Sequence, residues 1–144
     1  MDASRYDALK LENQLCFPLY ACAREVVKRY KPFLDDIDLT YTQYVTMMVL
    51  WEKPESTSRE IGERLHLDSG TLTPVIKKLA EKGLVTRRRS PKDERNLDVE
   101  LTDAGLALRE RAACIPGKMG GCIRLDPEDA RTLYRILYQL LNEL

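Results

Sequence analysis

The feature that most constrains this chain is residues 57–102, where a helix-turn-helix pattern is followed by a basic hairpin. Glu60 stands three residues after Thr57, the spacing of a capping box, so a helix is predicted to begin after Thr57. Asp68 is a preferred N-cap residue and predicts the start of a second helix, which Gly83 is expected to end. Two short helices that follow each other closely, each with an N-cap residue, are typical of a helix-turn-helix that binds DNA.

The second of these helices has one apolar face and one polar face. At about 100° per residue, the residues predicted to be buried are Leu72, Val75, Ile76 and Leu79. Small N-terminal residues of such a helix can reach base edges, and lysines further along can reach phosphates. The residues predicted to contact the major groove or its flanks are Ser69, Thr71, Thr73, Lys77 and Lys78.

A hairpin with a long basic tip is predicted next. Residues 84–89 and 97–101 read as strands, and residues 90–96 are turn-rich. From Pro74 to Arg95 there are eight cations and three anions, a net +5 within a chain of net charge +0. Arg88, Lys92 and Arg95 are therefore further candidate DNA contacts. The alternative is that these charges form only a solvated surface. That interpretation would be preferred if the charge run were not attached to a helix-turn-helix.

The sequence LDSGTLTP…IKKLAEKGLVTRRRSPKDERNLDVELTDAG resembles the MarR family of dimeric winged-helix regulators. The resemblance implies a mainly α fold with a small β-hairpin wing, built as a dimer that binds double-stranded operator DNA. In that family the arginine of the DER wing motif enters the minor groove, and the matching residue here is Arg95.

Composition limits the class of protein. At 144 residues, 32% charged and 44% hydrophobic, the chain suits one globular unit without a membrane span. No signal peptide is evident, so a cytoplasmic protein with reduced cysteines is expected. The four cysteines lack a CxxC pair, and His66 is the one histidine, so no metal site and no cofactor are expected.

Helices are predicted on both sides of residues 57–102. A helix over about 9–33 contains Pro18, so either it starts near Cys16 or a longer helix is kinked there. Lys31-Pro32 and the acids after it are expected to end that helix, and Thr40 with Gln43 predicts the next capping box. Residues 52–56 are expected to be a linker.

Residues 103–144 are predicted to be helical, with a break or irregular turn near 115–124 where Gly117, Gly120 and Gly121 cluster. The segments 9–33 and 103–144 are too apolar to remain uncovered, which predicts a homodimer formed through them. The whole chain is thus expected to be one unit, with these two segments as dimerisation helices.

The N-terminal sequences LENQLCFPLYACAREVVKRYKPFL and LTYTQYVTMMVLWE resemble the organic-hydroperoxide-sensing branch of the MarR family. In that branch the cysteine of QLCF reacts with peroxide, and two tyrosines hydrogen-bond its sulfur across the dimer interface. The matching residues are Cys16, Tyr30 and Tyr41. The chain departs from the branch at Pro18 and Thr42.

The other cysteines have less defined roles. Cys22 is about 240° around a helix from Cys16 and is interpreted as packing. Some members of the branch use a C-terminal cysteine to resolve the oxidised one, for which Cys122 is the candidate and Cys114 the less favoured choice. A small cellular thiol is the alternative resolving group, with Cys122 buried in a dimer core.

The function expected from the resemblance is a repressor that releases its operator when an organic hydroperoxide oxidises Cys16. The first alternative is a MarR-type repressor that is released by a small phenolic or anionic ligand. The second is a thiol peroxidase, but the sequence contains no catalytic His/Asp arrangement and no resolving CxxC, so an enzyme is not expected.

Overall fold

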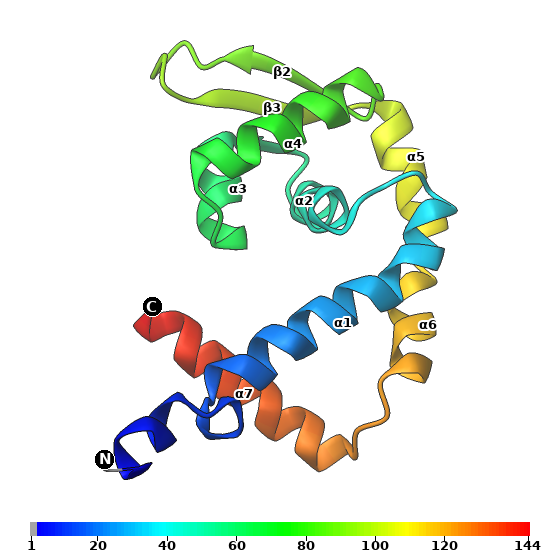
Figure 1. The fold of residues 1–144 in the computed structure, drawn as a ribbon. Helices are drawn as coiled ribbons and strands as arrows, with labels where there is room; N and C mark the ends of the chain where they lie inside the picture. Colours follow the sequence, from blue (N-terminus) through cyan, green and yellow to red (C-terminus); the bar gives the residue numbers. More distant parts are fainter. Residues whose placement is uncertain (1–2) are drawn as a thin grey trace. The chain divides into compact units, whose positions relative to one another are not determined.

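The computed structural model describes residues 3–144, and the chain forms two compact units that divide between Cys114 and Ile115 (Figure 1). The first unit consists of η1 Ala3–Leu9, η2 Leu11–Asn13, α1 Cys16–Asp35, α2 Tyr41–Glu52, β1 Glu55–Thr57, α3 Ser58–Leu65, α4 Ser69–Glu81, β2 Val85–Arg89, β3 Leu97–Leu101 and α5 Asp103–Ala112. The second consists of α6 Ile115–Cys122 and α7 Pro127–Glu143.

Capping residues begin most of these helices where their spacing predicts. Thr57 and Glu60 exchange side-chain and backbone hydrogen bonds at α3, and Thr40 and Gln43 do the same at α2, so both capping boxes are confirmed. Gly83 follows α4 with φ +73°, a left-handed conformation that glycine adopts without steric cost. These helix boundaries follow from hydrogen bonds that span only three or four residues.

The wing is part of a three-stranded antiparallel sheet in the order β1-β3-β2. The predicted hairpin is confirmed, with Val85 opposite Leu101 and Arg89 opposite Leu97. The prediction of a linker over 52–56 is wrong, because Glu55–Thr57 forms β1 on the free edge of β3. Three residues are too few to show an alternating pattern, so this strand could not be recognised from the sequence. It forms by pairing with β3.

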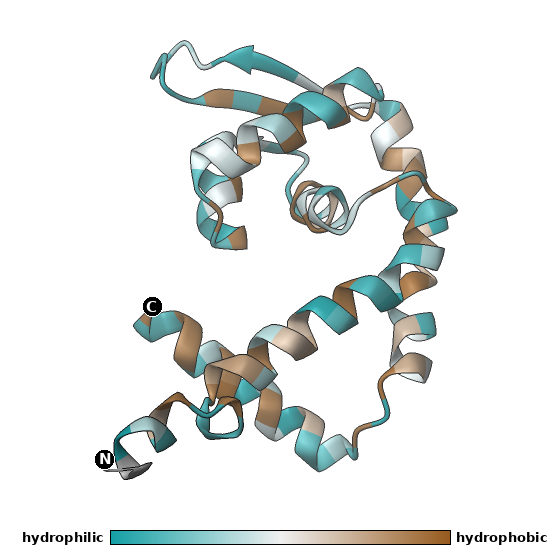
Figure 2. Cartoon of the chain, viewed as in Figure 1, coloured by the Kyte–Doolittle hydropathy of each residue, from teal (hydrophilic) through white to brown (hydrophobic). Residues whose placement is uncertain are grey.

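The core of the first unit lies where α2, α3 and α4 meet the inner face of the sheet, as the brown faces of these elements indicate (Figure 2). Its fully buried side chains include Met47, Leu50, Ile61, Ile76 and Val99. Trp51 donates its indole N–H to the Gly105 carbonyl over 2.9 Å, which ties α2 to α5. This packing holds α4 and the wing as one body.

Helix α1 begins at Cys16, with Pro18 in its first turn, which confirms the first of the two predicted geometries. The helix continues through Pro32 and ends at Asp35, two residues beyond the predicted range and at the first of the acids expected to end it. Burial of Leu34, which is 2% exposed, and the Lys31–Asp35 ion pair at 2.8 Å support the helix over these last residues.

The structure of the second unit differs from the break predicted near residues 115–124. Residues 115–122 form α6, so the irregular segment expected near 115–124 is confined to the connections on either side of that helix. Its glycines lower helix propensity, but Ile115 and Met119 are one helical turn apart and both are buried. Asp126 caps α7 as predicted, by accepting the Glu128 backbone N–H over 2.9 Å.

Candidate redox site and nucleic-acid interface

The recognition helix α4 is fixed at its N-terminus by Asp68. This carboxylate accepts the Thr71 backbone N–H at 2.8 Å and the Thr71 hydroxyl at 3.1 Å. These two hydrogen bonds hold the pKa of Asp68 below its ordinary value, and burial opposes them. A charged cap at this position complements the helix dipole and stabilises the turn that carries Ser69 and Gly70.

The two faces of α4 are those that its sequence predicts. Leu72, Ile76 and Leu79 are 0–1% exposed and Val75 is half-buried, which confirms the apolar stripe. The exposed predicted DNA contacts on this helix are Ser69, Thr71, Thr73, Lys77 and Lys78. The structure therefore places all five on the solvent side of α4, and their contact with DNA remains a prediction.

The tip of the wing is ordered by the side chain of Asp93. Its carboxylate accepts the Arg95 backbone N–H at 3.0 Å and the Asn96 side-chain amide at 3.2 Å. The Ser90 backbone N–H donates to the Asn96 carbonyl at 3.0 Å, which closes the loop. This turn leaves Arg95 exposed at the end of the hairpin, the position expected for a residue that enters a minor groove.

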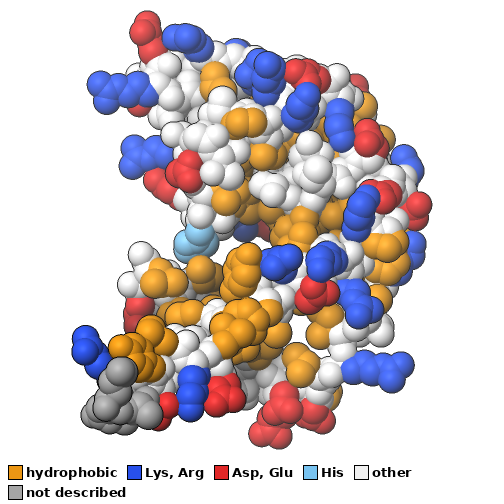
Figure 3. Space-filling view, viewed as in Figure 1, with side chains coloured by type: hydrophobic (Ala, Val, Ile, Leu, Met, Phe, Trp, Pro, Cys, Tyr) orange, Lys and Arg blue, Asp and Glu red, His pale blue; other side chains and the backbone are white. Residues whose placement is uncertain are grey.

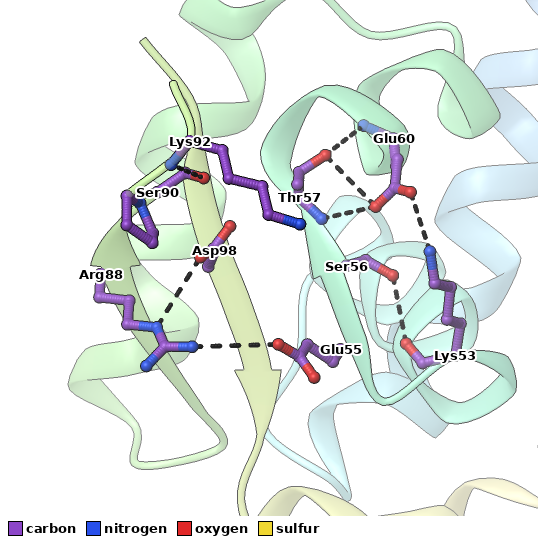
Figure 4. A pocket seen from close by; sticks show the side chains of 10 residues that line it. Lys53, Glu55, Ser56, Thr57, Glu60, Arg88, Ser90, Lys92 and Asp98 are labelled. Atoms are coloured by element: carbon purple, nitrogen blue, oxygen red, sulfur yellow. Dashed lines mark hydrogen bonds and ion pairs between the residues drawn. The ribbon is translucent and has the colours of Figure 1, made fainter. Parts of the chain in front are cut away.

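The wing is also tied to α3 and β1, near the end of its strands that carries the tip loop. The Leu97 backbone N–H donates to the Ser58 hydroxyl at 3.1 Å. On the outer face of the sheet the Arg88 guanidinium lies 3.8 Å from Asp98 and 4.0 Å from Glu55, beside a groove of about 400 Å³ (Figure 4). Lys92 also lines this groove.

Strand alternation separates the three consecutive arginines of β2. Arg87 and Arg89 stand opposite Val99 and Leu97, whereas Arg88 stands opposite Asp98 on the other face. The Arg88 guanidinium is therefore directed to carboxylates of the sheet, and contacts from Arg88 and Lys92 to DNA remain predictions. Lys and Arg side chains are nevertheless spread over the wing and α4 on the face shown in Figure 3.

Cys16 is the first residue of α1, and its thiol is exposed. The N-cap residue, Leu15, has an apolar side chain that cannot accept the N–H groups of the first turn. Unsatisfied N–H groups at a helix N-terminus attract negative charge. This position therefore suits a cysteine that reacts as its thiolate.

Tyr30 and Tyr41 are brought together at the other end of α1. Their ring centroids are 4.9 Å apart, and Tyr44 joins them at 5.9 Å from Tyr30 and 6.4 Å from Tyr41. Burial raises the pKa of Tyr30, and burial followed by the proximity of Tyr30 raises the pKa of Tyr41. Both phenols are therefore protonated at neutral pH and can donate hydrogen bonds to a sulfur or oxygen anion.

Cys16 and Tyr30 cannot meet within one chain. They are separated by 14 residues of a single α-helix, a distance of about 21 Å along its axis. An apolar groove of about 280 Å³ lies beside Tyr41, between the second half of α1 and the start of α2. Its lining residues include Val27, Leu34 and Leu39.

The remaining cysteines are all exposed thiols. Cys22 is exposed on α1 of a single chain, and its packing stays a prediction for the dimer. Cys122 is the last residue of α6, and Cys114 lies just after α5. Within residues 3–144, no group of three or more His, Cys, Asp and Glu side chains is arranged to hold a metal ion.

Three features of these surfaces lie outside the sequence-based predictions. Tyr44 joins the tyrosine pair, Ser58 anchors the wing, and Lys82 contacts the corner between α1 and α2. Tyr44 could have been included from its spacing of three residues after Tyr41, which places both on one face of α2. Each of the other two contacts joins residues about 40 positions apart in the sequence, so no local pattern indicates them.

Sequence comparison finds that this chain is similar to regulators of transcription. The profile described as "Transcriptional regulator SarA/Rot" matches residues 28–111. The organic hydroperoxide resistance transcriptional regulator of Bacillus subtilis is 48% identical over 141 residues, which cover 98% of this chain and 96% of that protein.

Structural comparison finds the same kind of protein. The structure of reduced AbfR bound to DNA is similar with a TM-score of 0.78 and 33% identity, covering 97% of each chain. The structure of disulfide-formed AbfR has a TM-score of 0.62 and 32% identity, covering 99% of this chain and 97% of that one. AbfR is a protein of Staphylococcus epidermidis. Within residues 3–144, no helix has the length and apolar character needed to cross a membrane.

Proposed function

Since this chain belongs to the MarR family of winged-helix transcriptional regulators, in the group that includes the organic hydroperoxide resistance regulator of Bacillus subtilis, we propose that it is a repressor that senses organic hydroperoxides through Cys16. The observation that carries the proposal is the placement of an exposed Cys16 at the uncapped start of α1. The reduced protein binds its operator in the cytoplasm, and the oxidised protein releases it.

A homodimer completes the redox site in this proposal. Because Tyr30 lies about 21 Å along α1 from Cys16 of the same chain, the phenols that stabilise the sulfur must come from the second subunit. The groove beside Tyr41 offers an apolar surface on which the segment around Cys16 of that subunit can pack. Protonated Tyr30 and Tyr41 then donate hydrogen bonds to the Cys16 thiolate.

Exposed apolar side chains at both ends of the chain support the dimer. Leu15 is 86% exposed and Leu144 is 92% exposed. Helix α7 repeats such residues along its length (Figure 2), namely Leu133, Ile136, Leu140 and Leu141. Apolar surface of this extent is characteristic of an interface, so segments 9–33 and 103–144 are proposed to form it. A monomer mass in light scattering at micromolar concentration would contradict this assignment.

The proposed chemistry has two steps. The Cys16 thiolate attacks one oxygen of the hydroperoxide, so an S–O bond forms, the O–O bond breaks, and the alcohol leaves after protonation. A second thiol then attacks the sulfenic acid, forming an S–S bond and releasing water. Apolar neighbours such as Phe17 and Leu19, each 43% exposed, suit alkyl or aryl hydroperoxides.

Cys122 of the second subunit is the proposed resolving thiol. It is exposed at the end of α6, and the similarity to an AbfR structure with a formed disulfide is consistent with this chemistry. Non-reducing electrophoresis after one equivalent of cumene hydroperoxide tests the assignment. A covalent dimer should form in wild type and Cys114→Ser but be lost in Cys16→Ser and Cys122→Ser. If the oxidised protein instead remains a monomer with Cys16 as a sulfenic acid, the resolving group would be a small thiol.

The decisive experiment for the function is DNA binding with and without cumene hydroperoxide. The probe is the tightest duplex that the reduced protein selects from a randomised library. Wild type should release this duplex after oxidation, and Cys16→Ser should retain it. Release by Cys16→Ser, or by a phenolic compound without oxidation, would instead identify a ligand-responsive repressor.

A further inference from the structure

Helix α1 joins the rest of the first unit mainly through its C-terminal end. The side chains of its first turn are exposed, whereas Leu34 is 2% exposed. Ile37 and Leu39, in the corner that follows the helix, are 7% and 5% exposed. With 20 residues, α1 is about 30 Å long, so Cys16 lies at one end and this buried corner at the other. Within this unit, α1 is therefore connected to the DNA-binding elements by this corner and by the contacts of Tyr30 with Tyr41 and Tyr44.

Lys82, at the C-terminus of α4, is bonded directly to this corner. Its ammonium donates to the Asp38 carbonyl oxygen and lies 3.2 Å from the Gln43 side-chain oxygen and 3.3 Å from the Asp38 carboxylate. The Lys82 side chain is only 27% exposed, unlike the 65% exposed Lys78 one turn earlier. Lys82 is therefore directed into the protein and away from the exposed lysine face of α4.

The acceptors of Lys82 are themselves held in place. Asp38 has φ +53°, a left-handed conformation in which Asp and Asn are enriched, and it joins α1 to α2. Gln43 caps α2 through its hydrogen bonds with Thr40. One ammonium thus connects the end of the recognition helix to the corner after α1 and to the start of α2.

A second cation holds the same corner. The guanidinium of Arg111, on α5, donates to the Asp36 carbonyl. We call Asp36, Asp38, Gln43, Lys82 and Arg111 the corner clamp. Its two cations come from the helices that precede and follow the wing, so both sides of the DNA-binding region are bonded to the end of α1.

We propose that Lys82 is a positioning residue that couples α1 to the recognition helix, so that a change at Cys16 alters the presentation of α4. The inference rests on the proposed redox function and names the contact through which that function reaches DNA. Coupling between distant sites can be carried by rigid elements joined by contacts that both sites influence. Here α1 is the rigid element, and the corner clamp joins it to α4.

The test compares the affinity of reduced and oxidised protein for the duplex selected by the reduced wild type. Lys82→Gln should lower the ratio of these affinities by about 2- to 30-fold, the range for substitutions along a coupled network. Lys82→Arg should restore most of the ratio because it keeps the charge and the donors. Lys53→Gln is the matched control, because Lys53 is 60% exposed and belongs neither to the corner clamp nor to the predicted DNA contacts, and it should keep the wild-type ratio.

A merely structural or DNA-contacting role predicts other results. If Lys82 bound a phosphate, Lys82→Gln would weaken both redox forms equally and reduce the salt dependence of binding by about 0.9 in slope. That result, or an unchanged affinity ratio, would overturn the proposal. A thermal midpoint close to that of wild type is expected for Lys82→Gln, since the buried apolar core is unaltered.

Asp38→Asn provides a second test that does not depend on Lys82→Gln being folded. Asn tolerates the positive φ at this position, while the substitution removes the negative partner of Lys82. It should lower the affinity ratio in the same direction by a smaller factor, and an unchanged ratio would count against the proposal. A wild type that keeps its affinity after oxidation would refute the redox function itself. A responsive wild type with an equally responsive Lys82→Gln would refute only this inference.

Discussion

Substitution of Gly105 by alanine should destabilise the DNA-binding unit, although alanine is the better helix former. Gly105 is buried in the first turn of α5, where an added Cβ would lie 2.1 Å from the Leu84 carbonyl oxygen and 2.9 Å from a Leu101 methyl group. The Leu84 carbonyl also accepts the Thr102 backbone N–H over 3.1 Å. Neither partner can move without disturbing the start of β2 or the end of β3.

The magnitude follows from two opposed effects. Replacing glycine by alanine in a helix gains about 1 kcal/mol of helix propensity. Relief of the 2.1 Å contact requires a shift of about 1 Å between α5 and the base of the wing, and forced shifts of this kind cost about 1–3 kcal/mol. The Thr102 to Leu84 hydrogen bond and the Trp51 bond to Gly105 would weaken as well, at about 1 kcal/mol each.

We therefore expect Gly105→Ala to lower the free energy of unfolding by about 2–4 kcal/mol. At roughly 2–4 °C per kcal/mol for a chain near this size, the thermal midpoint should fall by about 4–16 °C. Urea unfolding at one fixed protein concentration is the appropriate assay, because the proposed dimerisation would make apparent stability depend on concentration.

Ala107→Gly provides the matched control, since Ala107 is exposed on the same helix. It should cost about 1 kcal/mol and so measure the propensity difference alone. If Gly105→Ala is as stable as wild type, or more stable by that same amount, then α5 does not press on the base of the wing. The reasoning from the Leu84 contact would be refuted.

Three further predictions concern the DNA-binding unit. Arg95→Ala should weaken binding to the selected duplex by about 1–3 kcal/mol, and equal affinities for variant and wild type in moderate salt would remove Arg95 from the interface. Thr57→Ala should lower the free energy of unfolding by about 1 kcal/mol in urea titrations, whereas Thr57→Ser should retain the cap of α3. Hydrogen bonds from Thr71 lower the pKa of the Asp68 carboxyl in the folded protein. The stability that ionised Asp68 contributes is therefore fully present above the ordinary Asp pKa of about 4, and it is lost as the pH falls through the lowered pKa of the folded state. Asp68→Asn keeps a capping oxygen without a titrating group, and its stability should depend less on pH below about 4 than that of wild type.

The parts of this protein that can be predicted from its sequence alone are those whose hydrogen bonds are local. Thr57 with Glu60, Thr40 with Gln43, and Asp68 with Thr71 each lie three residues apart, so helix starts could be predicted from spacing. The buried stripe of α4 and the two strands of the wing follow from the helical and strand periods in the same way. These local signals were sufficient for the winged helix-turn-helix.

Predictions were wrong where a local preference competes with packing. The glycines of α6 disfavour helix, yet the segment is helical where Ile115 and Met119 are buried. β1 was missed because its three residues form a strand only by pairing with β3, more than 40 positions later.

The distant residues that form the sites are brought together by the three-dimensional packing of the chain. It brings Tyr30 beside Tyr41 and Tyr44, and Lys82 to Asp38 across 44 positions of sequence. It also separates Cys16 from Tyr30 by the length of a rigid helix. A cap depends on neighbours three residues away and is visible in a single chain segment. Contacts between segments depend on how side chains fill the core, and that arrangement is settled only when all the segments pack together.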